Sequence, residues 1–301
     1  MADSLSKNIF STITYYDVLD YPMTAFEVWK YLIAQNAEKT SLTEVLKILE
    51  TEEIKKYVSE YRGFYFLKDR KNLVEERIER NKISQWKLKK ARKIIFWLQF
   101  VPFVKMIAVA GRVGMKNAKN GSDIDLLIIF QRGKIFTGRL LATALVQIFG
   151  RRRHKNKIAN RICFNHFLTD EFSVSVQDLY SSHNYIFLSV LYGAKVFQKF
   201  LEKNQWIKNY RPNFSFLENN LKTVEDTRVS FGIRKILEII FSSAWIEKKL
   251  SDWQIEKIKK NPLTRKPGGM IIFNDCELAF WPDFENQGPK IFEAFQNKSN
   301  G

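Results

Sequence analysis

Along the first 72 residues, apolar positions recur at helical spacing in three segments and then alternate in two short runs. A break at residues 20–22, Asp-Tyr-Pro, separates the first two helices within residues 8–35. Two capping boxes mark where the second and third helices begin: Thr24 with Glu27, and Ser41 with Glu44. The alternating runs, 57–61 and 64–67, predict a hairpin. Three helices followed by a hairpin are typical of a winged helix, a module that often binds DNA or RNA.

Charge counts against groove binding by this first module. Residues 1–60 carry more Asp and Glu than Lys and Arg, whereas a nucleic-acid surface needs the opposite balance. A packing or protein-contact role is therefore favoured over DNA binding. From Leu73 to Lys93 the pattern changes to one long basic helix. Its charged face is either solvated or in contact with phosphate, and the sequence leaves both interpretations open. The basic positions are Arg77, Arg80, Lys82, Lys87, Lys89, Lys90, Arg92 and Lys93.

The middle of the chain alternates short apolar runs with helical patterns. Three runs predict strands at 104–110, 124–130 and 161–168, and a helix at 136–149 connects the second to the third. Residues 172–176 suggest a fourth strand. Beyond Asp178 the periodicity is mainly helical, through 179–200 and 215–260 around a break at 206–212. A hairpin (270–273 with 278–281) and a terminal helix near 288–296 follow. The expected fold class is α+β, with domains at 1–72, 73–180 and 181–301.

Composition narrows the function classes. The formal net charge of +17 favours a polyanionic partner, although a lysine-rich genome would give a basic protein without one. Two cysteines, Cys163 and Cys276, are too few for a disulfide framework or a four-ligand zinc site, and they suit a reducing compartment. The N-terminus lacks a signal pattern, and the apolar stretch 94–111 is interrupted by polar residues. We therefore expect a cytoplasmic protein without a membrane partner; the oligomeric state is left open.

The strongest chemical pattern is the pair Asp123 and Asp125, at the start of the second predicted strand. Side chains two residues apart in a strand point to the same face, so the two carboxylates lie together. Such a pair repels unless a divalent cation lies between them. Gly111 and Gly114 precede the pair in a loop where bare backbone amides can approach a triphosphate. This layout is typical of phosphoryl transfer assisted by Mg²⁺ or Mn²⁺.

The segments Gly111-Arg112 and Ser122-Asp-Ile-Asp-Leu126 resemble the glycine loop and Asp-x-Asp signature of the polymerase-β nucleotidyltransferase superfamily. The motif covers about 20 residues, and the surrounding order of strands and helices extends the likeness to roughly 90–180. The resemblance implies that Asp123 and Asp125 hold Mg²⁺ or Mn²⁺ and that an NTP is the substrate. It further implies transfer of a nucleoside monophosphate to a hydroxyl acceptor, with RNA favoured. The implied nucleotide-binding residues are Gly111, Arg112, Gly114 and Ser122.

Two departures from the family pattern bear on turnover. Arg112 stands where the family usually has a serine; an arginine can pair with a phosphate or fill the pocket. The family also supplies a third carboxylate from a later strand. Asn165 or His166 stands at that position, and only Asn165 is a tentative Mg²⁺ ligand, through its carbonyl oxygen. Weaker candidates for the missing ligand are Asp170, Glu171 and Asp178.

A basic cluster follows the helix at 136–149 and is the best candidate for polyanion binding, although it can equally be a solvated loop. His154 within it is expected to be exposed, and His183 to be structural or to line the cleft. The competing hypothesis is a catalytically degenerate protein of the same fold that binds nucleic acid or a protein partner. A transcriptional regulator acting through the first module is a third. The cluster comprises Arg151, Arg152, Arg153, Lys155 and Lys157.

Overall fold

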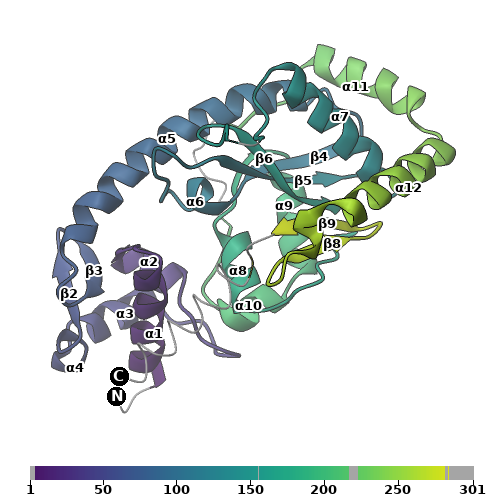
Figure 1. Cartoon of the computed structure of the whole chain (residues 1–301). Coiled ribbons are helices and arrows are strands. Elements are labelled where there is room, and N and C mark those ends of the chain that lie inside the picture. The colour runs from purple at the N-terminus through teal and green to yellow at the C-terminus, as the bar shows by residue number, and fades with distance from the viewer. Residues whose placement is uncertain (1–3, 155, 217–222, 282–283, 285–301) are drawn as a thin grey trace.

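Figure 1 shows the computed structural model of the chain, which describes residues 4–154, 156–216, 223–281 and 284. These residues form a mixed α/β structure with a small three-stranded sheet and a larger six-stranded sheet. No helix among them combines the length and apolar character needed to cross a membrane. The described residues thus contain the mixture of helices and strands that the sequence predicts.

The N-terminal part contains the helices and the hairpin that the sequence predicts, together with a two-residue strand. Both capping boxes are present, with each Ser or Thr hydroxyl accepting from the N3 amide. Helix α2 ends at Lys30, earlier than the predicted 35, and α4 was not anticipated. The three strands pair antiparallel in the order β1-β3-β2. The elements are α1 (Ser4–Val18), β1 (Met23–Thr24), α2 (Ala25–Lys30), α3 (Leu42–Leu49), α4 (Glu52–Lys55), β2 (Val58–Tyr61) and β3 (Phe64–Leu67).

The long basic helix exists as α5 (Asn72–Leu98), which runs from the N-terminal sheet to the larger one (Figure 1). Three of its cations point inward, so neither a solvated nor a phosphate-contacting role applies to them. Arg77 donates to Lys116 O and Glu27 Oε1, at 3.0 Å each. Arg80 contacts Asp20, and Lys87 is fully buried. These side chains satisfy carbonyl and carboxylate groups at the junction between the two parts of the chain.

The larger sheet has the strand order β7-β4-β5-β6-β9-β8, in which β5 and β6 are parallel and the other pairs are antiparallel. Its strands are β4 (Val104–Val109), β5 (Ile124–Phe130), β6 (Ile162–Thr169), β7 (Ser189–Tyr192), β8 (Met270–Phe273) and β9 (Glu277–Trp281). The helices around it are α6 (Gly111–Gly114), α7 (Ile135–Ile148), α8 (Leu179–Ile186), α9 (Ala194–Lys203), α10 (Trp206–Tyr210), α11 (Arg228–Ile240) and α12 (Ala244–Lys260). A 3-10 turn spans Pro262–Arg265.

The structure differs most from the elements predicted by the sequence in the second half of the chain. The hairpin at 270–281 is confirmed and joins the larger sheet beside β6. The helix predicted over 179–200 is wrong for 189–192, because these four buried residues form edge strand β7 against β4. Residues 172–176 form no strand. The predicted terminal helix near 288–296 lies outside the described residues. Of the three strands beyond Asp178, β8 and β9 are therefore the predicted hairpin, and β7 was expected to be helical.

The sheet separates two apolar cores, as the alternation along β5 requires. Leu126, Ile128 and Phe130 face the core that contains α5 and α7. Leu127 and Ile129 face the opposite core, which is continuous with the N-terminal helices and with α8–α10. The N-terminal part is thus packed on one face of the sheet, consistent with the packing role that its acidic balance favours.

Candidate metal and nucleotide site

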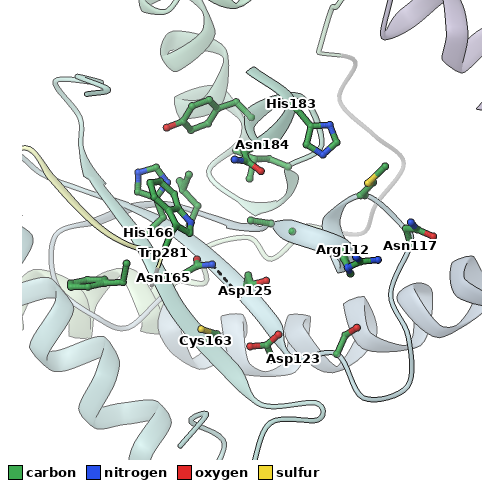
Figure 2. A pocket seen from close by; sticks show the side chains of 18 of the residues that line it. Arg112, Asn117, Asp123, Asp125, Cys163, Asn165, His166, His183, Asn184 and Trp281 are labelled. Carbon is green, nitrogen blue, oxygen red and sulfur yellow. Dashed lines mark hydrogen bonds between the residues drawn. The ribbon is translucent and has the colours of Figure 1, made fainter. Parts of the chain in front are cut away.

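Asp123 and Asp125 lie where β5 begins, and both carboxylates point into one cavity (Figure 2). The Ala110 amide donates to Asp125 O at 2.9 Å, which ties the start of α6 to β5. Gly111 follows with a φ of +60°, and a Cβ there would lie 2.5 Å from Asp125 Oδ2. Glycine is therefore required at position 111 for two reasons: the backbone is left-handed, and the Asp125 carboxylate leaves no room for a Cβ. The structure brings together the residues of the predicted motif.

Cys163 completes the cluster from the neighbouring strand. It pairs with Asp125 in the parallel register of β5 and β6, and one ligand atom from each of Asp123, Asp125 and Cys163 lies within 4.8 Å of the others. The sequence pattern predicted no position for Cys163 beside the two carboxylates. The available signal was the β5-helix-β6 order, which makes the two strands parallel neighbours and places the polar start of β6 beside the carboxylates.

The cluster carries more negative potential than its surroundings neutralise. Burial, followed by repulsion from Asp123, raises the pKa of Asp125 to about 7. Burial, together with the adjacent Asp125 and Asp123, raises the pKa of the Cys163 thiol to about 12. In both groups the charged form is disfavoured for the same two reasons. A cation placed among them would remove the repulsive part of this penalty.

The predicted basic cluster is divided by the structure. Arg153 reaches into the site, where its Nη1 lies 2.6 Å from Asp123 Oδ2 and 3.7 Å from Cys163 Sγ. Its backbone amide donates to Ile162 O at 2.8 Å, which fixes the side chain beside β6. Arg151 and Arg152 are exposed next to it, as are His154 and Lys157 in the following turn. Lys155 lies outside the described residues.

The two residues at the expected third-carboxylate position make different contacts. Asn165 Nδ2 donates to Asp125 Oδ1 at 2.9 Å, so its amide already contacts the pair (Figure 2). His166 Nε2 instead lies 3.0 Å from Glu277 Oε1, on the side toward β9. The remaining candidates serve local structure: Asp170 accepts from the Arg132 amide, Glu171 pairs with Arg132, and Asp178 caps α8. Among the described residues that line the cavity, Asp123 and Asp125 are the only carboxylates.

The cavity has a volume of about 390 Å³ and contrasting walls. Arg112 is exposed at one side, and His183 and Asn184 of α8 lie across the cavity from the two carboxylates (Figure 2). Burial, reinforced by Arg211, lowers the pKa of His183 to about 3, so its imidazole is neutral at physiological pH. His183 thus lines the cleft while packing against Tyr15 and Phe187. Both predicted roles of His183, as a structural residue and as part of the cleft lining, therefore apply.

The loop before Asp123 is held from beneath by a buried lysine. Lys87 Nζ donates to Asn120 O, Ser122 O and Asn160 Oδ1 at 2.6–2.9 Å. The Ser122 hydroxyl accepts from the Lys119 amide at 3.1 Å, so it shapes the turn while lining the cavity. Gly114 is buried, and a Cβ there would lie 2.6 Å from Val109 O and 2.7 Å from Phe187 O. The backbone carbonyls of Val109 and Phe187 therefore leave no room for a side chain at position 114.

Comparison with known proteins finds no relative: no protein-family model matches the chain, and neither does any curated protein or solved structure. Function is therefore inferred from the residues and geometry of the site.

Proposed function

We propose that this chain is a polymerase-β-like nucleotidyltransferase that uses a divalent metal to transfer a nucleoside monophosphate from an NTP to a hydroxyl acceptor. One observation carries the proposal. Two adjacent carboxylates, Asp123 and Asp125, line a cavity of about 390 Å³ beside a glycine turn that closely approaches Asp125. The β4-α6-β5-α7-β6 order around the pair supports the same family. On this proposal the N-terminal module is a winged-helix-like domain.

The residues present suit a divalent cation, because one ligand atom from each of Asp123, Asp125 and Cys163 lies within 4.8 Å of the others. When bound, the cation supplies charge neutralisation for the phosphates and the leaving pyrophosphate. The chain's own residues bind and orient. Gly111 leaves space next to Asp125, and Arg112 at the cavity wall is placed to pair with a phosphate. Asn165 holds the Asp125 carboxylate in place through its amide.

RNA is the proposed acceptor class, because the exposed Arg151, Arg152 and Lys157 lie in the segment next to the site. These cations can contact a backbone phosphate while the acceptor hydroxyl lies in the cavity. Replacing Arg151 and Arg152 with alanine should weaken RNA binding and reduce its dependence on salt. The same variant should leave NTP binding unchanged, since neither residue lines the cavity.

The test is label transfer by the purified full chain. Each labelled NTP is incubated with Mg²⁺ or Mn²⁺ and pooled tRNA, and incorporation into RNA, protein and small acceptors is measured. Transfer by the wild type that is lost in Asp123→Ala and Asp125→Ala supports the proposal. Equal labelling by the wild type and both variants, or no labelling under any condition, rejects it.

A second candidate is a degenerate member of the fold that binds nucleic acid without turnover. The Arg153–Asp123 ion pair favours it, because an internal cation already engages one of the two motif carboxylates. This candidate predicts salt-sensitive RNA or DNA binding that is unaffected by Asp123→Ala. Negligible affinity at low salt would reject it, and specific label transfer would replace it with the first proposal.

A further inference from the structure

The third ligand position of the cluster holds a sulfur atom, and this changes which metals fit it. Cys163 Sγ shares one 4.8 Å neighbourhood with oxygens of Asp123 and Asp125. Magnesium is a hard cation that takes oxygen ligands and rarely accepts a thiolate. Thiolates instead select softer divalent metals such as zinc and cobalt. The donor set therefore differs from the three oxygens expected of a magnesium-dependent nucleotidyltransferase.

The spacing of the three groups suits a metal of this class. Metal–oxygen and metal–sulfur bonds of about 2.0–2.3 Å place neighbouring tetrahedral ligands roughly 3.5 Å apart. Because the three ligand atoms already lie within 4.8 Å of one another, side-chain movements of about 1 Å or less would close the cluster around one ion. The backbone needs no change, because Asp125 and Cys163 are paired neighbours on β5 and β6.

A cation of the chain already lies against this cluster. The Arg153 guanidinium is 2.6 Å from Asp123 Oδ2 and 3.7 Å from Cys163 Sγ, so it contacts two of the three groups from the solvent side. The Arg153 side chain is 44% exposed, whereas that of Asp123 is 16% exposed. The arginine can therefore turn outward into solvent while the carboxylate remains in place. Its present position shows that the cluster attracts positive charge.

We propose that Asp123, Asp125 and Cys163 bind a thiophilic divalent transition metal in exchange for the Arg153 guanidinium. The step forms one metal–sulfur and two metal–oxygen bonds in place of three bonds from the ion to water, and it breaks the Arg153–Asp123 ion pair. The thiol proton of Cys163 and any proton on Asp125 pass to solvent, and Arg153 becomes free to contact an anionic ligand at the cavity mouth. The proposal rests on the metal dependence of the proposed function and gives the metal site a different selectivity.

The test is a titration of the metal-free, full-length protein with Co²⁺, monitored in the near-ultraviolet for thiolate-to-cobalt charge transfer. The wild type should develop the band at one equivalent, and a tenfold excess of Mg²⁺ should not remove it. The chain offers a matched control, because Cys276 is its only other cysteine and lies at 3.1 Å from Glu171, outside the cavity lining. Cys276→Ser should retain the band, whereas Cys163→Ser should lose it.

Affinities measured by calorimetry complete the test. Cys163→Ser should weaken Co²⁺ binding by more than about 10-fold. Removing a residue that only supports a metal ligand already weakens metal binding by about 10- to 100-fold. Arg153→Gln should strengthen binding by about 2- to 5-fold, as expected for release from a solvent-accessible ion pair. Circular dichroism of each variant verifies that it is folded. If a variant does not fold, the presence or absence of the band in the wild type still tests the inference.

Three results would overturn the inference: no band in the wild type, a band retained in Cys163→Ser, or removal of the band by Mg²⁺. Failure of the proposed function is separable from these results. If the band appears as described but no NTP label is transferred, the metal site stands and the nucleotidyltransferase proposal falls. If no band forms, and label is transferred with Mg²⁺ equally by the wild type and Cys163→Ser, the nucleotidyltransferase proposal stands and the metal-site inference falls.

Discussion

Two carboxylates, on the strands at either side of β6, illustrate different environments for an acid in a protein. Glu277 on β9 lies 3.0 Å from His166 Nε2 and accepts from the Ser175 amide at 2.8 Å. Burial acts to raise the pKa of Glu277, but these hydrogen bonds hold it below its ordinary value. Asp125 on β5 accepts from Asn165 beside a second carboxylate, and its pKa is raised to about 7. One acid is satisfied by donors; the other is left with charge for a cation to neutralise.

The largest expected effect is on the satisfied acid. Glu277→Ala removes a partner of the buried His166 and leaves the Ser175 amide without its acceptor, so the free energy of unfolding should fall by about 3–5 kcal/mol. Urea denaturation followed by tryptophan fluorescence measures this. The control is Asp275→Ala, two residues away and exposed, which should change stability by less than about 0.5 kcal/mol. Similar losses in the two variants would contradict a structural role for Glu277.

The next effect concerns the lysine beneath the site. Lys87→Met keeps the length of the side chain but leaves Asn120 O, Ser122 O and Asn160 Oδ1 without their shared donor. We expect a loss of about 2–3 kcal/mol, because buried acceptors without a partner pay their full desolvation cost. Lys89→Met, exposed on the same helix, should be neutral. Lys87→Met should also bind metal more weakly, because the loop that Lys87 holds carries Asp123. Unchanged stability and metal affinity in Lys87→Met would contradict this role.

A glycine substitution separates backbone strain from crowding of the carboxylate. Gly111 and Gly133 both have positive φ, of +60° and +68°, but only at Gly111 would a Cβ meet Asp125 Oδ2. Each alanine variant should lose about 1–2 kcal/mol for the left-handed conformation. Gly111→Ala alone should also impair metal binding, measured by calorimetry. Equal metal affinity in the two variants would show that the close approach to Asp125 is unimportant.

The sequence predicted what depends on local pattern. Capping boxes placed α2 and α3, and alternation with its flanking turns placed the hairpins, because these signals act within a few residues. The Asp123/Asp125 pair was found for the same reason. Strand β7 was missed because its four buried residues form a strand only through pairing with the distant β4.

The rest of the site depends on contacts that periodicity cannot show. Cys163 joins it through the parallel register of β5 and β6, and Arg153 through the hydrogen bond from its amide to Ile162 O. Lys87 reaches it across 33–73 residues of chain. A run of basic residues is read in sequence as a surface, because nothing local reveals that an inward-facing cation has carbonyl acceptors. Register between distant strands and the direction of long side chains are both tertiary properties.

The smallest effect distinguishes the two acids by the sign of their pH dependence. Because the pKa of Asp125 is raised to about 7 in the folded protein, the folded state binds this proton more tightly than the unfolded chain. Its contribution is present below about pH 4 and is lost as pH rises toward 7. In metal-free protein, Asp125→Asn should therefore stabilise at pH 8, and because the cavity admits water the gain is on the order of 1 kcal/mol.

That gain should vanish below about pH 4, where the wild-type carboxyl is protonated in both states. Glu277→Gln should behave in the opposite way. The depressed pKa of Glu277 stabilises the folded protein above its unfolded value of about 4.5, so this variant should lose stability at pH 8 and lose less as the solution becomes acidic. Urea titrations of both variants and the wild type at pH 4, 6 and 8, with chelator present, measure the two slopes. Slopes of the same sign would mean that both carboxylates are held by donors, and Asp125 would then have no unneutralised charge with which to bind a metal.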